Sequence, residues 1–194
     1  MPTGLKAVRP IAMAEILAAR ERIAGTAVRT PLIRLELGPG YPDIRLKLEN
    51  LQPINAYKLR GAANAVALLS AAERERGVWT ISAGNAGQGV AYSARKAGVP
   101  CTVVVIETAP ASKIERMRAM GATVVLAGED FDAAKAIGKA EAAHRGVRFI
   151  EDSRDPEPTE GAGTMALELS TFPEPLDALF VPLGNGAMLA GIAT

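Results

Sequence analysis

From Val78 onward, short β-branched runs alternate with helical stretches, and this alternation limits the fold more than any other feature of the chain. Such spacing predicts a parallel sheet with helices on both faces. The turns that follow the strands then share one edge of the sheet, where ligands of open α/β sheets bind, and we expect Ser82 and Gly184 on that edge. Strands are expected at 78–82, 101–106, 123–127, 147–150 and 178–182, and helices at 87–96, 111–119, 131–144, 157–169 and from 186 to the end.

The first part of the chain reads as a covering helix followed by extended segments. Residues 11–23 predict an amphipathic helix that ends at Gly25. Pro31 keeps its neighbour out of helical conformation, so 30–35 is expected to be extended. A strand is expected at 46–51, and an Ala-rich helix at 60–69.

Lys58 lies between that strand and that helix, in Asn55-Ala56-Tyr57-Lys58-Leu59-Arg60-Gly61-Ala62. The positive end of a helix reduces the free-energy cost of a neutral amine, and burial or a nearby cation would lower the pKa of the amine further. A neutral lysine amine is a nucleophile that forms an imine with an aldehyde. The alternative is an exposed lysine at a helix start, since most lysines are exposed.

Two Gly-rich turns, each between an expected strand and an expected helix, accompany this lysine. In Gly184-Asn185-Gly186-Ala187 several main-chain N–H groups can converge on a phosphate, although a tight turn without a ligand has the same pattern. In Ser82-Ala83-Gly84-Asn85-Ala86-Gly87 the side chains can donate to a ligand or simply cap a helix.

Together and in this order, the three motifs resemble the signature of the fold-type II pyridoxal phosphate enzymes, and they are most similar to the threonine/serine dehydratase branch. The resemblance extends from about Ile16 to the last residue. It implies an α/β fold with two parallel-sheet domains and helices on both faces. The smaller domain would be 52–152, and 1–51 plus 153–194 would form the N-terminal portion of the larger, PLP-binding domain. Family chains continue past Thr194, so the C-terminal part of the larger domain would be missing.

The resemblance also assigns roles to residues. Lys58 would bind pyridoxal 5'-phosphate covalently and act as the catalytic base, and Asn85 would hydrogen-bond the ring oxygen of the cofactor. No metal is implied. The phosphate would be held by Gly184, Asn185, Gly186, Ala187 and Met188, and the substrate by Ser82, Gly84, Asn85 and Ala86.

Three departures from the family pattern bear on the reaction. Ala56 replaces a serine that serves racemases as the second acid/base, so elimination ranks above racemisation. Ala86 stands where many relatives have histidine, which affects substrate choice, and Asn185 and Ala187 interrupt a run of glycines.

The expected function is therefore a PLP-dependent ammonia-lyase, or dehydratase, that converts threonine or serine to a 2-oxo acid and ammonia. Serine racemase, threonine synthase, diaminopropionate ammonia-lyase, cysteine synthase-like activity or an inactive binding fragment are the alternatives. A nucleotide-binding domain is disfavoured because no Gly-x-Gly-x-x-Gly follows the first strand.

Composition indicates a small-molecule partner, here an amino acid. The 194 residues include 22 Lys+Arg and 21 Asp+Glu, so neither nucleic acid nor an acidic membrane is an expected partner. One cysteine and one histidine exclude an internal disulfide and a His/Cys zinc cluster. With neither an apolar span nor a signal peptide, the protein is expected in the cytoplasm, and the resemblance implies a homo-oligomer, a dimer or tetramer.

Four other ionisable residues receive plainer interpretations. His144 is expected at a helix C-terminus and Cys101 in the core. Glu160 is interpreted as a solvated first-turn carboxylate, with a cleft position as the alternative. Arg60 is expected to support the site or to pair with a carboxylate.

Overall fold

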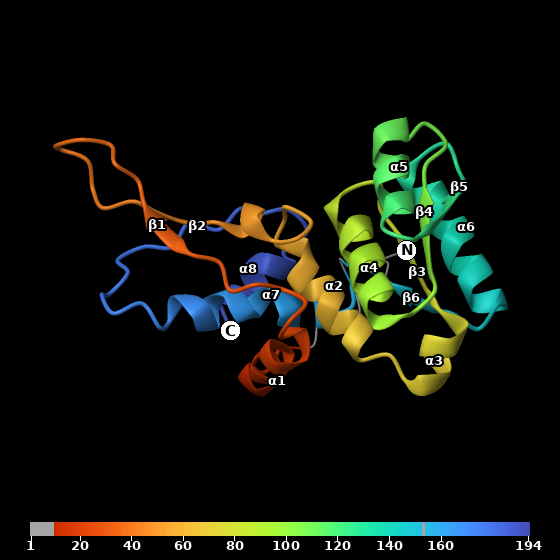
Figure 1. The fold of residues 1–194 in the computed structure, drawn as a ribbon, viewed down its shortest axis with the longest axis horizontal. Coiled ribbons are helices and arrows are strands. Elements are labelled where there is room, and N and C mark those ends of the chain that lie inside the picture. The colour runs from red at the N-terminus through yellow and green to blue at the C-terminus, as the bar shows by residue number, and fades with distance from the viewer. Residues whose placement is uncertain (1–9, 153) are drawn as a thin grey trace, which may run out of the picture.

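The computed structural model describes residues 10–152 and 154–194, and Figure 1 shows its helices and strands. A four-stranded parallel sheet with its helices lies at one end, and a group of helices with a short two-stranded ribbon lies at the other. The strands are β1 (Leu32–Arg34), β2 (Arg45–Lys47), β3 (Val78–Ile81), β4 (Cys101–Val105), β5 (Thr123–Leu126) and β6 (Arg148–Ile150). The helices are α1 (Met13–Ile23), the 3-10 helix η1 (Glu49–Leu51), α2 (Lys58–Ala67), α3 (Ala71–Arg76), α4 (Asn85–Ala97), α5 (Ala111–Ala119), α6 (Phe131–His144), α7 (Pro156–Leu169) and α8 (Ala187–Ile192).

The parallel sheet has the strand order β5-β4-β3-β6, with Thr80 opposite both Val103 and Ile150. Side chains of α2, α4 and α5 pack on one face of it, and α6 packs on the other around Val104. The predicted α/β fold with helices on both faces of a parallel sheet is confirmed. The predicted bounds of α5 and α6 agree with the structure.

The carboxyl edge of this sheet brings two loops together. Ser82 directly follows β3, and Asp152 lies two residues beyond β6. Because β3 and β6 are adjacent and parallel, with Thr80 opposite Ile150, both loops leave the sheet at the same edge. This is the edge where ligands bind in open α/β sheets.

Helix α2 is held between α4 and α7 by glycines that allow close backbone approach. A Cβ added to Gly89 of α4 would lie 3.2 Å from the Lys58 carbonyl oxygen. A Cβ added to Gly161 of α7 would lie 2.4 Å from the Arg60 carbonyl oxygen, which is closer than real Cβ atoms come. Helix α7 also meets α8 where Gly163 faces Gly191. These contacts fix the start of α2 against both the sheet layer and the C-terminal helices.

Two predictions of local structure were wrong, and one helix was missed. The segment 178–182 is not a strand, because a strand requires a paired neighbour and the described residues provide none there; Phe180 is 93% exposed. The strand expected at 46–51 covers only Arg45–Lys47, pairs antiparallel with β1 and is followed by η1. Helix α3 was not predicted, although Ser70 and Glu73 form a capping box at its start.

No helix in the described part of the chain is both long and apolar enough to cross a bilayer.

Candidate functional site

Lys58 is the first residue of α2 and lies at the carboxyl edge of the sheet. Its side chain is 17% exposed, and its Nζ donates to Asp152 Oδ2 at 2.6 Å. The Nζ also lies 4.9 Å from the centre of the Tyr57 ring. Before the helix, the chain turns through Asn55, which has a φ of +59° in the left-handed region that asparagine tolerates. The lysine is thus anchored at a defined place.

The charge state predicted for Lys58 was wrong. Burial by itself lowers the pKa of the amine, but the hydrogen bond and negative charge of Asp152, with a contribution from Tyr57, outweigh it and raise the pKa above its ordinary value. The contact with Asp152 therefore favours the ammonium form of the amine. The helix N-terminus favours a neutral amine, but the carboxylate of Asp152, 94 residues further along the chain, has the opposite effect.

The turn 184–188 reaches the same carboxylate. Asn185 Nδ2 donates to Asp152 Oδ2 at 2.6 Å, the oxygen that also accepts from Lys58. Asn185 Oδ1 accepts from the Ala187 N–H at 3.2 Å, and Gly186 has a φ of +87° in the left-handed region. A Cβ added to Gly184 or Gly186 would meet nothing within 4 Å, so open space lies beside these glycines.

The start of α4 supplies further donors. Ser82 Oγ accepts from the Gly84 N–H at 2.9 Å. Among the described residues no side chain caps α4, so Ser82 and Asn85 are not helix caps. Asn85 is exposed, and Ala86 lies in the first turn of α4. Within the described residues no hydrogen bond joins Ser82 or Asn85 to Lys58; the backbone approach of Gly89 to Lys58 brings α4 beside it.

Asp152 is the site residue that sequence reasoning missed. A usable signal was present, because Asp152 follows the expected strand 147–150 at the edge where Ser82 was already placed. A carboxylate just beyond the carboxyl end of a parallel strand is a candidate for a ligand-binding edge.

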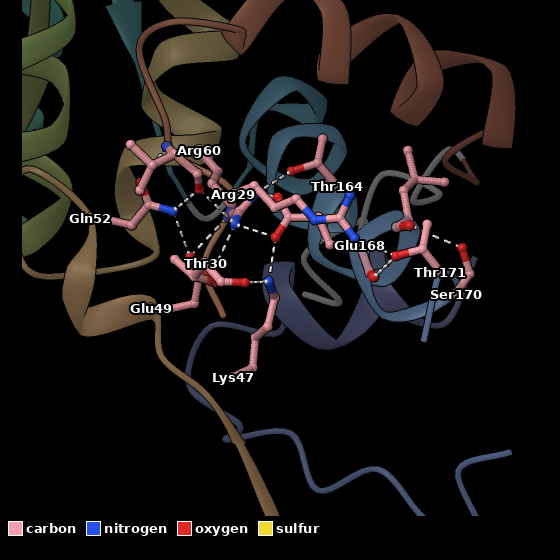
Figure 2. Close-up of polar contacts among 12 residues, drawn as sticks. Arg29, Thr30, Lys47, Glu49, Gln52, Arg60, Thr164, Glu168, Ser170 and Thr171 are labelled. Atoms are coloured by element: carbon pink, nitrogen blue, oxygen red, sulfur yellow. Dashed lines mark hydrogen bonds and ion pairs between the residues drawn. The ribbon is translucent and has the colours of Figure 1, made fainter. Parts of the chain in front are cut away.

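Arg60 of α2, two residues after Lys58, is the centre of a buried ion network, whose polar contacts Figure 2 shows. Arg60 donates two hydrogen bonds of 2.8 Å to Glu49 and bonds of 2.6 and 3.0 Å to Glu168 of α7. Lys47 also pairs with Glu168. Burial alone lowers the pKa of Arg60, but the two carboxylates raise it above its usual range, so the guanidinium stays charged. The expectation that Arg60 pairs with a carboxylate is confirmed.

A cavity of about 440 Å³ lies elsewhere, between the end of α7, the segment 172–179 and Ile192. None of the predicted site residues lines it. Because it has neither the lysine nor the Gly-rich turns, the chemistry points to the carboxyl edge and not to this cavity.

His144 and Cys101 have the plain roles expected of them. His144 is the exposed last residue of α6. Cys101 begins β4 in the core, and burial raises the pKa of its thiol to about 12, so the reactive thiolate is disfavoured. Neither residue contributes to the site.

Glu160 is not the solvated carboxylate that was predicted. It is 7% exposed in the second turn of α7, where its Oε2 accepts from Asn64 Nδ2 at 2.9 Å and lies 3.7 Å from Arg22 Nη1. Burial is the main cause that raises the pKa of Glu160, and the charges of Glu15 and Glu157 raise it further. Asn64 and Arg22 lower the pKa but do not offset this increase. The ionised form of Glu160 is therefore less favoured in the folded state than in the unfolded state.

This raised pKa predicts that Glu160→Gln gains stability relative to the parent chain as pH rises. The folded chain binds the Glu160 proton more tightly than the unfolded chain does. Protonation of Glu160 therefore stabilises the parent chain fully below the pKa of the unfolded state, and this stabilisation is lost as pH rises through the pKa of the folded state. From about pH 4 to about pH 7, the free energy of unfolding of the variant should therefore increase relative to that of the parent chain. Urea unfolding at several pH values measures this.

Glu21→Gln, at an exposed carboxylate, serves as the control for a change of net charge. A Glu160→Gln variant that loses stability toward neutral pH would mean that Asn64 and Arg22 make the carboxylate favourable as an anion.

Fold and site together define a class: an α/β protein with a lysine and a Gly-rich turn at the ligand-binding edge of a parallel sheet. A family model described as "Pyridoxal-phosphate dependent enzyme" matches residues 23–194. The chain belongs to this family.

Individual relatives agree with this assignment. The chain is 40% identical over 182 residues to L-threo-3-hydroxyaspartate ammonia-lyase of a Pseudomonas species, covering 92% of this chain and 57% of the relative. It is 40% identical to L-threonine ammonia-lyase of Thermotoga maritima, covering 78% of this chain and 38% of the relative. The processed form of threonine deaminase isoform 2 from Solanum lycopersicum superposes with a TM-score of 0.84 at 32% identity, covering 100% of this chain and 59% of that structure. The predicted fold-type II architecture is confirmed, and the chain spans between 38% and 59% of the length of these three proteins.

The donors at the edge fit pyridoxal phosphate. Lys58 supplies an amine for the aldehyde, the uncapped start of α4 supplies uncharged N–H donors for anionic oxygens, and open space lies beside Gly184 and Gly186. The described residues contain no cluster of His, Cys, Asp or Glu that could hold a metal ion. The family's cofactor and the chemistry of this donor set therefore agree.

Proposed function

We propose that this chain is the cofactor-binding portion of a pyridoxal phosphate-dependent ammonia-lyase that acts on a hydroxy amino acid, threonine or serine, and releases a 2-oxo acid and ammonia. The observation that carries the proposal is the meeting of Lys58 and Asn185 at one oxygen of Asp152. It supports a common site for the lysine and the turn 184–188. The similarity to ammonia-lyases supports the reaction class.

In this proposal each part of the edge has one task. Lys58 would bind the cofactor covalently and, as a free amine, would take the substrate α-proton at Nζ. The phosphate would be held by main-chain N–H groups of Gly184, Asn185, Gly186, Ala187 and Met188, and Asn85 would donate to the ring oxygen. The substrate carboxylate would be held at the start of α4 by Ser82, Gly84, Asn85 and Ala86. When bound, pyridoxal phosphate supplies a ring that stabilises negative charge at the substrate α-carbon.

Ala56 supports elimination over racemisation. The Ala56 side chain is a methyl group and offers no hydroxyl as a second proton donor. It is 8% exposed and packs with Ile54 and Leu59. Racemisation needs proton exchange on two faces of the α-carbon, whereas elimination needs one base. Serine racemase activity is therefore the second candidate, and it rests on family membership alone.

The wider organisation belongs to the same proposal. Residues 52–152 form the smaller domain, and 1–51 with 153–194 form part of the larger one, with Lys58 and Asp152 near the two boundaries.

A homo-oligomer in the cytoplasm completes the proposal, and light scattering of the purified chain tests the assembly.

Cofactor loading tests the function directly. The chain is mixed with pyridoxal phosphate, reduced with borohydride and digested, and the modified peptide is identified by mass; the expected position is Lys58. The loaded chain is then assayed for ammonia and 2-oxo acid from L-threonine, L-serine and L-threo-3-hydroxyaspartate, and for D-serine formation. Cofactor on Lys58 without turnover would favour a binding fragment, and D-serine as the main product would favour the racemase.

A further inference from the structure

The carboxylate of Asp152 faces Lys58 and is itself fixed in place. The segment after β6 forms a turn in which the N–H groups of Arg154 and Asp155 both donate to the Glu151 carbonyl at 3.0 Å. The Asp155 carboxylate accepts from the Glu151 N–H at 2.8 Å, which ties the turn to itself. These hydrogen bonds therefore restrain Glu151, Arg154 and Asp155, on either side of Asp152, at the sheet edge.

One oxygen of Asp152 binds two residues from different parts of the chain. Its Oδ2 accepts from Lys58 Nζ and from Asn185 Nδ2, each at 2.6 Å, and its carbonyl oxygen accepts weakly from Asn185 Nδ2 at 3.4 Å. The Lys58 and Asp152 side chains are 17% and 26% exposed, so water screens the pair only in part. The carboxylate thus links α2 to the turn that precedes α8.

We propose that Asp152 is a positioning residue for Lys58, whose carboxylate keeps the amine charged and anchored beside Asn185 until a phosphate-bearing aldehyde arrives. This inference rests on the proposed function only for the role of Lys58. The contact opposes the chemistry that Lys58 must perform, since only the neutral amine attacks an aldehyde. Asp152 therefore sets how readily the cofactor attaches at neutral pH.

Among the side chains around Lys58, Asp152 has the largest influence on the amine. In the described part of the chain, the side chains that act on the Lys58 amine are Asp152, from the loop after β6, and Tyr57, which precedes α2. Asn185 contributes an uncharged amide, and α4 approaches through the backbone of Gly89. Removing the Asp152 charge leaves burial as the main effect, and burial favours the neutral amine.

Competitive labelling of the cofactor-free chain tests this without any enzyme assay. The chain is treated with trace acetic anhydride across a pH series, and the Lys58 peptide is quantified by mass spectrometry. Asp152→Asn should increase Lys58 acetylation near neutral pH by about tenfold, because an opposite charge at this range shifts a pKa by at least about one unit. Asp152→Glu should restore most of the slow labelling, and Asp132→Asn, remote in α6, should change nothing.

The same digest reports on folding, since Lys47 in its buried ion pair with Glu168 should remain slow in every variant. Should Asp152→Asn expose Lys47, Asp152→Ser provides a second way to remove the charge. Equal Lys58 labelling in the parent chain and in a folded charge-removing variant would overturn the proposal, and so would failure of Asp152→Glu to restore slow labelling.

A second measurement uses the cofactor. The rate of covalent attachment of pyridoxal phosphate near neutral pH should be about tenfold higher in Asp152→Asn than in the parent chain, and the two rates should converge at alkaline pH. No attachment to either chain would contradict the proposed function, whereas the labelling result would still decide the role of Asp152. Attachment at equal rates near neutral pH would overturn the positioning role alone.

Discussion

Lys58→Ala should abolish covalent attachment of pyridoxal phosphate and lower ammonia release from the preferred hydroxy amino acid by roughly 10²- to 10⁴-fold, the range for loss of a general base. The reason is that Lys58 is the amine that pairs with Asp152 at the sheet edge, and the same carboxylate oxygen also accepts from Asn185 of the turn 184–188. An absorbance scan and mass analysis after borohydride reduction measure the loss of covalent attachment, and an ammonia assay measures the loss of activity.

Lys58→Arg is the matched control for this variant. It retains a positive charge for Asp152, but a guanidinium is always protonated and cannot attack the aldehyde. Both variants should lack covalent cofactor, while Lys58→Arg should unfold at nearly the parent urea concentration. Added methylamine should recover part of the activity of Lys58→Ala, where space is available, and none of that of Lys58→Arg. Persistence of a lysine-linked cofactor in Lys58→Ala would show that another amine is the attachment point.

The helices and the parallel sheet were predictable because their signals are local. Asp130 caps α6 by accepting from the Ala133 N–H at 2.8 Å, and Gly146, with a φ of +62°, lies in the turn that follows the helix. These features lie within a few residues of the helix that they bound, so a pattern along the chain contains them. The same holds for the β-branched runs of the sheet, which show a buried strand without reference to its neighbours.

Apart from the missed helix α3, whose Ser70–Glu73 capping box is a local signal, the failures depend on a distant partner. The segment 178–182 has the composition of a strand, but pairing decides whether a strand forms, and none of the described strands lies beside it. The charge of Lys58 depends on Asp152, which is 94 positions away. A helix N-terminus is visible in the sequence, whereas a carboxylate brought to it by the fold is not. The placement of Lys58 at the edge was therefore predictable, and its protonation was not.

Arg60→Met should destabilise the chain by about 3–5 kcal/mol, because removing one partner leaves buried charges without compensation. The Arg60 side chain is 1% exposed, and its guanidinium is shared between Glu49 and Glu168, whose side chains are 14% and 13% exposed. Lys47 would remain to balance Glu168, but Glu49 would keep only the neutral donors Thr30 and Gln52. Urea unfolding of the variant and parent chains gives the difference in free energy.

Two further variants separate charge from shape in this network. Arg60→Lys keeps the charge but loses the planar two-fold bonding to each carboxylate, so its loss should be intermediate. The triple variant Arg60→Met/Glu49→Gln/Glu168→Gln removes the charges together and should recover much of the stability lost in Arg60→Met. Arg60 joins α2 to α7, so Arg60→Met should also leave Lys58, two residues earlier in α2, less firmly positioned. Covalent cofactor binding should then fall in proportion to the loss of stability. A loss below about 1 kcal/mol in Arg60→Met, with cofactor binding unchanged, would mean that the close glycine contacts of α2 with α4 and α7 suffice to position the lysine.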